Sequence, residues 1–323
     1  MSVVAGLLGC ALASAPPSEA TYPGRNGRIA FNGLHTVGGQ QLLQTEAIWP
    51  DGSGRRVLGE YGFPSWAASG RSLAALAFPP GEMGAVVFAG RSGRMIGSVP
   101  LPDTLPCGWR GGCSKDGPRE LTGFMLTAPA LSPDGRTVAF VQQSFDPAPP
   151  GTFQIRWIWT VRTDGSKLRR LALGDWPHWT PDGRRIVFQH FDAFGSIRSI
   201  ASMRRDGTDR RRVLWTAQDD TLLDVSPDGQ RVLWRGNGNP PKRPQVWGLY
   251  TSDLRGHNIH LVHRSPPYPS DACWSPDGKS IVFSRQGPGG ATWIIPAAGG
   301  HGRRLLDQPR AGLAWQPLPG ARR

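Results

Sequence analysis

The chain has 323 residues with 43 glycines, 31 prolines and 13 tryptophans, and its formal net charge is +13. This length is enough for two ordinary domains or for one large all-β domain. The sequence holds no long helical pattern, and its many glycines and prolines suit short strands joined by turns, which excludes an all-helical protein.

The amino terminus resembles an export signal. Residues 3–15 are apolar or small and end in Ala13-Ser14-Ala15, a cleavage pattern, and the run is too short to span a bilayer. The usual preceding positive charges are missing. We therefore predict that residues 1–20 are a signal peptide or lipoprotein signal with a linker, in a bacterial protein that is periplasmic, cell-surface or secreted. Cys10 ends a Leu-Leu-Gly-Cys box, so it is a weaker candidate for lipidation.

A nine-residue pattern recurs four times downstream. Each copy reads Ser/Thr-Pro-Asp-Gly, followed by an alternating apolar run, and the copies are Ser132–Phe140, Thr180–Phe188, Ser226–Trp234 and Ser275–Phe283. Proline, aspartate and glycine favour a tight turn, and the alternation favours a strand. Glycines spaced 48, 46 and 49 residues apart predict a repeat architecture.

Two degenerate copies complete the set. Residues 66–76 keep the tryptophan and the glycine, whereas Asn26–Phe31 has the turn and second strand but no strand before it. The missing strand is supplied at the other end of the chain, around Ala314-Trp315. We therefore predict a closed ring of six units in which Trp315 lies beside Ile29.

Each complete unit contains four strands, most clearly between residues 175 and 222. The predicted strands there are Pro177–Thr180, Arg185–His190, Ser196–Met203 and Arg211–Trp215. Four antiparallel strands per unit in a closed ring define a β-propeller. The predicted fold is therefore an all-β, six-bladed β-propeller that occupies residues 24–319 as a single domain.

The four Ser/Thr-Pro-Asp-Gly units, with their Trp and Phe partners, resemble the TolB-like six-bladed propeller family over about nine-tenths of the chain. The later Asp-Gly turns followed by Arg-Arg-Leu or Arg-Arg-Val are also characteristic. TolB is a periplasmic protein that binds a peptidoglycan-associated lipoprotein and other envelope proteins. It carries an α/β domain before its propeller, and nothing here corresponds to that domain. Similar propellers precede the hydrolase domain of prolyl-oligopeptidase-like enzymes.

Antiparallel blades sort the connections onto two faces. The tight turns share one face, and the long irregular connections share the other; these are residues 100–124, 144–152 and 236–244. Such loops either carry binding residues or are tolerated insertions.

The basic residues recur after the second turn of several units, at Arg55–Arg56, Arg169–Arg170, Arg210–Arg212 and Arg303–Arg304. They either protect the outermost strands from pairing or attract an anionic polymer, acidic lipid or acidic partner. No nucleic-acid recognition motif is visible.

Cysteines and histidines give few chemical signals. Cys107 and Cys113 are disulfide candidates if the protein is exported, and Cys273 is expected to be a buried, inert thiol. His257, His260 and His263 have helix-like spacing in a predicted strand, where His257 and His263 would share one side, so a metal site is not predicted.

The innermost strands carry one equivalent position just before the recurring tryptophan. In chain order it is occupied by Ser65, Ala130, His178, Asp224, Cys273 and Ala314. His178 and Asp224 fall on adjacent blades, so they either form a structural pair or hold a ligand or ion at the mouth of the channel. Asp220 and Asp271 are expected in loops just above, at the mouth of the channel.

The sequence thus predicts an exported, non-enzymatic, monomeric scaffold without a cofactor, which binds an envelope protein or anionic polymer through its long-loop face. The alternative is a lyase or hydrolase that acts on an anionic saccharide at the mouth of the channel.

Overall fold

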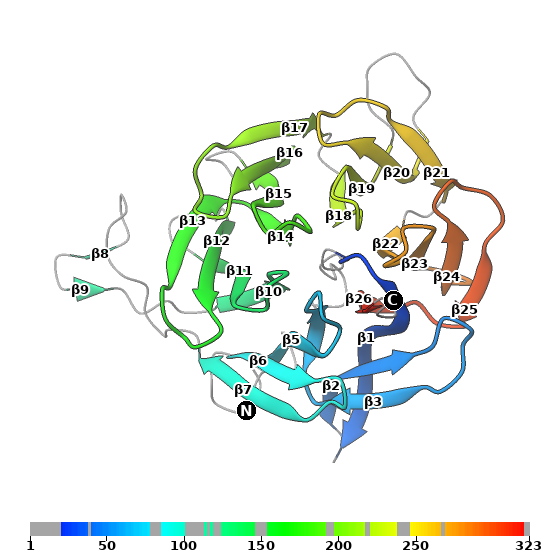
Figure 1. Ribbon diagram of the computed structural model, residues 1–323, viewed down its shortest axis with the longest axis horizontal. Coiled ribbons are helices and arrows are strands. Elements are labelled where there is room, and N and C mark those ends of the chain that lie inside the picture. The colour runs from blue at the N-terminus through cyan, green and yellow to red at the C-terminus, as the bar shows by residue number, and fades with distance from the viewer. Residues whose placement is uncertain are drawn as a thin grey trace.

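A computed structural model describes residues 21–37, 40–77, 85–100, 113–114, 117–118, 124–145, 154–191, 197–216, 220–237, 246–265 and 269–319. In this part of the chain all the regular elements are strands, and six four-stranded antiparallel sheets stand around a central axis (Figure 1). The predicted six-bladed propeller is confirmed. A short extra sheet pairs β8 (Cys113–Ser114) with β9 (Gly117–Pro118). Across these same ranges, no helix is long and apolar enough to cross a membrane.

We number the blades in ring order and give the strands of each from the axis outwards. Blade 1 consists of β26 (Ala311–Leu318), β1 (Arg25–Val37), β2 (Gln40–Ile48) and β3 (Arg56–Gly59). Blade 2 consists of β4 (Gly62–Trp66), β5 (Ser72–Ala77), β6 (Ala85–Gly90) and β7 (Met95–Pro100). Blade 3 consists of β10 (Phe124–Leu131), β11 (Thr137–Phe145), β12 (Gln154–Arg162) and β13 (Arg169–Leu173).

The other three blades follow the same order. Blade 4 consists of β14 (Asp175–Trp179), β15 (Arg185–Phe191), β16 (Ile197–Arg204) and β17 (Arg211–Trp215). Blade 5 consists of β18 (Thr221–Val225), β19 (Arg231–Gly236), β20 (Gly248–Asp253) and β21 (His260–Arg264). Blade 6 consists of β22 (Pro269–Trp274), β23 (Ser280–Arg285), β24 (Ala291–Pro296) and β25 (Arg303–Leu306).

The recurring turn has a local hydrogen-bond mechanism. In blade 3 the Asp134 carboxylate accepts a bond from the Ser132 hydroxyl at 2.6 Å and one from the Arg136 N–H at 3.0 Å. Gly135 supplies the positive φ, 68°, that the turn requires. Blades 4, 5 and 6 repeat these contacts around Asp182, Asp228 and Asp277. Blade 2 has no such aspartate, yet Gly70 takes the same conformation, with a φ of 61°.

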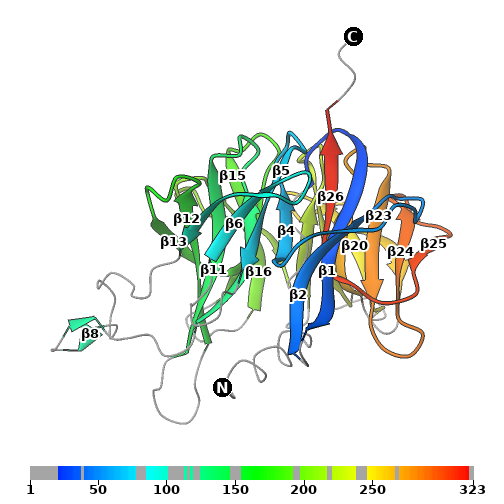
Figure 2. The same cartoon turned by 90° about the horizontal axis from the view of Figure 1, so that it is seen from below.

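The antiparallel order puts all these turns on one side of the ring. We call this side the tight-turn face; it carries the turns between first and second strands and between third and fourth strands. We call the opposite side the long-connection face. Figure 2 shows the tight turns at the top, where β26 ends.

The two ends of the propeller close the ring. Strand β26 pairs antiparallel with β1, and Ile29 lies opposite Trp315, as predicted. The Trp315 indole also donates a hydrogen bond of 3.1 Å to the Gly27 carbonyl. The last strand of the chain therefore serves as the innermost strand of the first blade.

Apolar side chains pack between blades rather than within them. The structure contains six buried clusters among the described residues, and each draws its side chains mainly from two neighbouring blades. A tryptophan of an innermost strand recurs in these clusters, at Trp66, Trp179, Trp274 and Trp315, each at most 3% exposed. The first three end their strands, whereas Trp315 lies inside β26. Each blade is thus stabilised by both of its neighbours.

Replacement of Trp315 by alanine tests the closure. Because Trp315 is 3% exposed, Trp315→Ala should lower the free energy of unfolding by about 3–5 kcal/mol, as measured by denaturant titration. Trp215→Ala is the control, since Trp215 is 59% exposed and its loss should cost about 0.5 kcal/mol or less. Equal effects of the two substitutions would contradict a closing role for β26.

Candidate functional site

The equivalent position on the innermost strands forms a ring of side chains around the axis. We call it the inner ring, and its members are Ser65, Ala130, His178, Asp224, Cys273 and Ala314, as predicted. All six are buried, with exposed fractions of 2% or less. Any chemistry at this ring is therefore that of groups shielded from water.

Polar members of the inner ring connect one blade to the next. The Ser65 hydroxyl in blade 2 accepts a hydrogen bond of 3.0 Å from the Leu131 N–H in blade 3. Asp224 in blade 5 accepts one of 2.7 Å from the Trp274 N–H in blade 6. Since Leu131 and Trp274 occupy equivalent positions, the two bonds are the same inter-blade contact made by different side chains.

Asp224 has further partners at the same carboxylate. It accepts bonds from the Val225 N–H at 2.7 Å and the Thr21 N–H at 3.1 Å, and the Thr21 hydroxyl lies 3.1 Å from its second oxygen. Burial raises the pKa of Asp224 well above its ordinary value, although these hydrogen bonds act in the opposite direction. The carboxyl is thus surrounded by donors from three separate parts of the chain.

His178 lies next to Asp224 without a hydrogen bond between them. The His178 Nδ1 is 4.0 Å from the nearer carboxylate oxygen, and neither ring nitrogen has a hydrogen-bond partner among the described residues. Burial lowers the pKa of His178 to about 3, so the ring is neutral at ordinary pH. The structure therefore brings the two predicted residues together as neighbours but not as an ion pair.

Asp220 lies in the connection before β18, as predicted, but Asp271 does not lie in a loop. Asp271 lies within β22 rather than in a loop, and both carboxylates are buried, with exposed fractions of 1% and 0%. Asp271 accepts a bond of 2.9 Å from the Leu313 N–H of blade 1, and Asp220 accepts one of 3.2 Å from the Asn237 N–H. Their contribution to ligand binding stays a prediction.

Sequence reasoning missed the segment that enters the centre of the ring. Thr21 contacts the Trp274 carbonyl at 2.9 Å as well as Asp224, while the Tyr22 hydroxyl donates a hydrogen bond to the Leu131 carbonyl. Both residues are at most 2% exposed. The packed propeller thus extends three residues before the predicted boundary at residue 24. No sequence signal marks this segment, because it belongs to no repeat.

Other candidate residues have ordinary surroundings or lie outside the described residues. The prediction that His257 and His263 share one side of a strand is wrong, because His257 precedes β21. The centre of the His263 ring lies 4.9 Å from that of Phe283. Cys273 is fully buried, and burial raises the pKa of its thiol well above the ordinary value. Cys10, Cys107 and the Cys113 side chain lie outside the described part, so the predicted disulfide and lipidation stay predictions.

Comparison with known proteins identifies the fold. No family model matches the chain. An uncharacterized protein of Agrobacterium fabrum is 42% identical over 69 residues, which span 20% of this chain and 21% of that relative.

Solved structures match far more of the chain. TolB from Acinetobacter baumannii superposes with a TM-score of 0.63 and 17% identity, over 90% of this chain and 67% of that one. The fold is a TolB-like propeller. A TolB candidate from Agrobacterium tumefaciens gives a TM-score of 0.54 and 16% identity, over 92% of this chain and 99% of that one.

Enzymes are also among the solved structures with a similar fold. An oligogalacturonate lyase from Vibrio parahaemolyticus superposes with a TM-score of 0.55 and 12% identity, over 90% of this chain and 79% of that one. At such low identity the likeness concerns the fold alone.

A substitution at His178 tests the neutral buried ring. The folded pKa is about 3 and the ordinary value is 6.5, so between these pH values the unfolded chain binds a proton that the folded chain does not. Stability should therefore fall by about 1.4 kcal/mol per pH unit as the pH drops below 6.5. His178→Phe should abolish this pH-dependent loss of stability and leave the free energy of unfolding at pH 7 unchanged or higher. Urea titrations of both proteins between pH 3 and pH 7 measure the two effects. If the free energy of unfolding depended on pH equally in both proteins, the His178 imidazole would not be neutral and buried.

Proposed function

We propose that this TolB-like propeller is an exported, non-enzymatic scaffold that binds a protein or polymer of the bacterial cell envelope through its long-connection face. The observation that carries the proposal is the division of the connections between the two faces. The turns between first and second strands in blades 2 to 6 are all five residues long, as in Thr180–Arg184. The turns between third and fourth strands, on the same face, are four to seven residues long, whereas the connections between second and third strands, at the opposite face, range from two to eleven.

This division favours binding at the long-connection face. A rigid ring of sheets holds the ends of its loops in fixed positions, and loops on such scaffolds carry binding residues in many proteins. Strands β7, β11 and β19 end at this face and lead into the long segments predicted from the sequence. Partner choice would then depend on these segments, while the blades supply the rigid support.

The inner ring favours a structural role over catalysis. His178 is 1% exposed and makes no hydrogen bond with Asp224, and the Asp224 carboxylate is engaged by Thr21, Val225 and Trp274. Both groups are thus packed inside the scaffold rather than presented to a substrate. The alternative of a lyase or hydrolase stays a prediction, because the similarity to the lyase is one of fold.

Site-specific photocrosslinking tests the choice of face. A photoreactive amino acid at Glu60 or Asp307, both exposed near the long-connection face, should crosslink an envelope protein or polymer in cells. The matched controls are Ser53 and Ser69, exposed in tight turns, where we expect no such product. Crosslinks to the envelope partner from the tight turns alone would overturn the proposal.

An activity assay tests the non-enzymatic part. The full chain and the His178→Ala variant should both leave polygalacturonate uncleaved, as measured by the appearance of unsaturated or reducing ends. Cleavage that is lost in the variant would show a catalytic use of the inner ring and contradict the scaffold.

A further inference from the structure

The positive charge of the protein is concentrated on the tight-turn face. The tight-turn segments are residues 25–28, 49–56, 67–71, 90–94, 132–136, 162–170, 180–185, 204–212, 226–231, 253–260, 275–279 and 296–304. They contain twenty-four Lys and Arg and nine acidic residues, all Asp, which gives an excess of fifteen positive charges. The whole chain has 37 Lys and Arg and 24 Asp and Glu. The rest of the sequence therefore holds thirteen basic and fifteen acidic residues. The entire net charge of +13 thus comes from one face.

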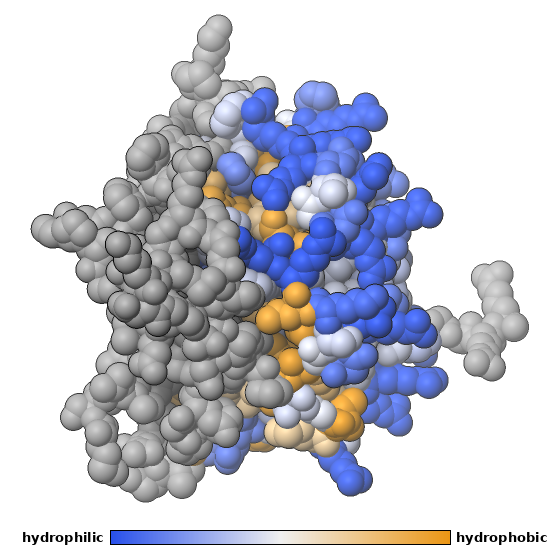
Figure 3. Space-filling view, turned by 90° about the vertical axis from the view of Figure 1, so that its left-hand side faces the viewer, coloured by the Kyte–Doolittle hydropathy of each residue, from blue (hydrophilic) through white to orange (hydrophobic). Residues whose placement is uncertain are grey.

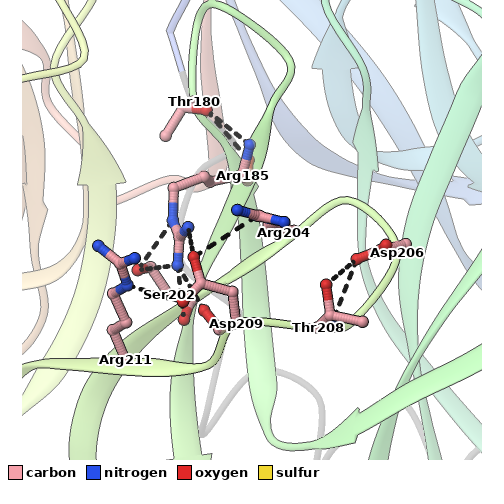
Figure 4. A network of polar contacts seen from close by, with 8 residues as sticks. All are labelled: Thr180, Arg185, Ser202, Arg204, Asp206, Thr208, Asp209 and Arg211. Atoms are coloured by element: carbon pink, nitrogen blue, oxygen red, sulfur yellow. Dashed lines mark hydrogen bonds and ion pairs between the residues drawn. The ribbon is translucent and has the colours of Figure 1, made fainter.

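The carboxylates on this face leave most of its cations uncompensated. The Asp134 carboxylate, like its counterparts in blades 4 to 6, is used to hold its own turn. In blade 4 three arginines pair with a single carboxylate, that of Asp209. Its oxygens lie 2.8 Å from Arg185, 2.8 Å from Arg211 and 3.6 Å from Arg204 (Figure 4). Hydrogen bonds from Arg185 and Arg211 lower the pKa of Asp209 to about 2. Even there, three cations share one anion.

Some of these arginines have a structural task. Arg56 donates a hydrogen bond of 2.6 Å to the Arg91 carbonyl of the next blade, and Arg303 donates one to the Pro50 carbonyl. These bonds join neighbouring blades across their outer turns. Arg28, Arg210 and Arg212 have comparable contacts, with the Gly54 carbonyl, the Leu171 carbonyl and the Trp215 ring. Contacts with carbonyls and aromatic rings do not neutralise charge, so the excess of positive charge remains.

Protection of sheet edges does not explain the remainder. Charges of either sign discourage edge pairing, yet the six outermost strands hold eight arginines and no aspartate or glutamate. Four exposed cations also follow the glycine of a first turn, close to the axis and far from any edge. We call these the turn ring, and its members are Arg71, Arg136, Arg184 and Lys279.

Exposed apolar side chains accompany these cations. The exposed large apolar residues of the described chain are Val57, Met95, Ile96, Leu168, Trp215, Ile259 and Leu261. All except Trp215 lie in a tight-turn segment or in the first two residues of an outermost strand. Figure 3 shows one side of the ring: blue residues crowd the right, where the tight-turn face lies, and orange residues are visible between them mainly in the middle of the view.

We propose that the tight-turn face docks on the surface of an anionic lipid bilayer. Lipid phosphates match guanidinium groups, which bind phosphate in a bidentate manner. A flat surface can meet cations from all six blades at once, and the apolar side chains among them would enter the boundary between headgroups and acyl chains. A soluble polyanion would use the cations but not the apolar residues. The long-connection face would then point away from the membrane, so this inference does not depend on the proposed partner.

Vesicle flotation with the full chain tests the docking surface. The protein should float with vesicles of phosphatidylglycerol and phosphatidylcholine and remain behind with phosphatidylcholine alone, and its affinity should fall as salt is raised. Each basic residue near an anionic bilayer contributes about fivefold to affinity. Four independent contributions multiply to about 600-fold. The combined variant Arg71→Gln, Arg136→Gln, Arg184→Gln and Lys279→Gln should therefore bind far more weakly, and a loss of less than about tenfold would count against the proposal. Exchange of the three arginines for lysine should keep the salt-dependent part of the binding and lose only the contribution of bidentate phosphate contacts.

A matched pair of charge reversals separates the face from the overall charge. Arg136 and Arg264 are both exposed, but Arg264 ends β21 at the long-connection face. Arg136→Glu should weaken flotation clearly, whereas Arg264→Glu, with the same change in net charge, should have little effect. Equal losses from the two variants would overturn the assignment to one face.

A third comparison distinguishes a bilayer from a soluble polyanion. Ile96→Ser with Leu168→Ser should weaken binding to the phosphatidylglycerol vesicles and leave binding to polygalacturonate or inorganic polyphosphate unchanged. Binding to either polyanion without binding to the vesicles would overturn the proposal, as would vesicle binding that is insensitive to both salt and the turn-ring substitutions. Unchanged unfolding transitions of the variants would exclude misfolding as the cause.

Discussion

Each blade of this protein buries its apolar faces only against its neighbours. Among the residues that the structure describes, six apolar clusters fill the six junctions between blades, and none of them belongs to one blade alone. An isolated four-stranded sheet would leave both of its apolar faces in water, so the blades are stable only as a closed ring. The pairing of β26 with β1 is therefore the contact on which the whole structure depends.

The same constraint explains the polar residues near the axis. Innermost strands from neighbouring blades do not pair as a sheet, so their N–H groups need other acceptors. Side chains supply them: Ser65 for Leu131, Asp224 for Trp274, and Asp271 for Leu313. A carboxylate at this depth would mark a functional site in many proteins. Here its hydrogen bonds show that it joins one blade to the next.

The two faces differ because an antiparallel blade sends different connections to each. Tight turns need a few residue types at fixed positions, which leaves the neighbouring positions free for a repeated cation such as Arg136 or Arg184. Because the turn is repeated around the ring, the same cation recurs in several blades and gives this face a net positive charge. The opposite face has no such repeated turn, so its connections vary independently. One scaffold can in this way present two surfaces of different chemistry.

The sequence by itself determined the repeat, the four-stranded blades, the closure by the last strand and the division into two faces. These features follow from the residue types of the turns and the alternation of apolar residues in the strands, and the same signals occur in each repeat. Only the tertiary structure decided the partners of the inner ring: Asp224 is engaged by Thr21, 203 residues away, and His178 is left without a hydrogen bond among the described residues. No periodic pattern encodes such contacts, because they arise where the closed ring brings distant, non-equivalent residues together.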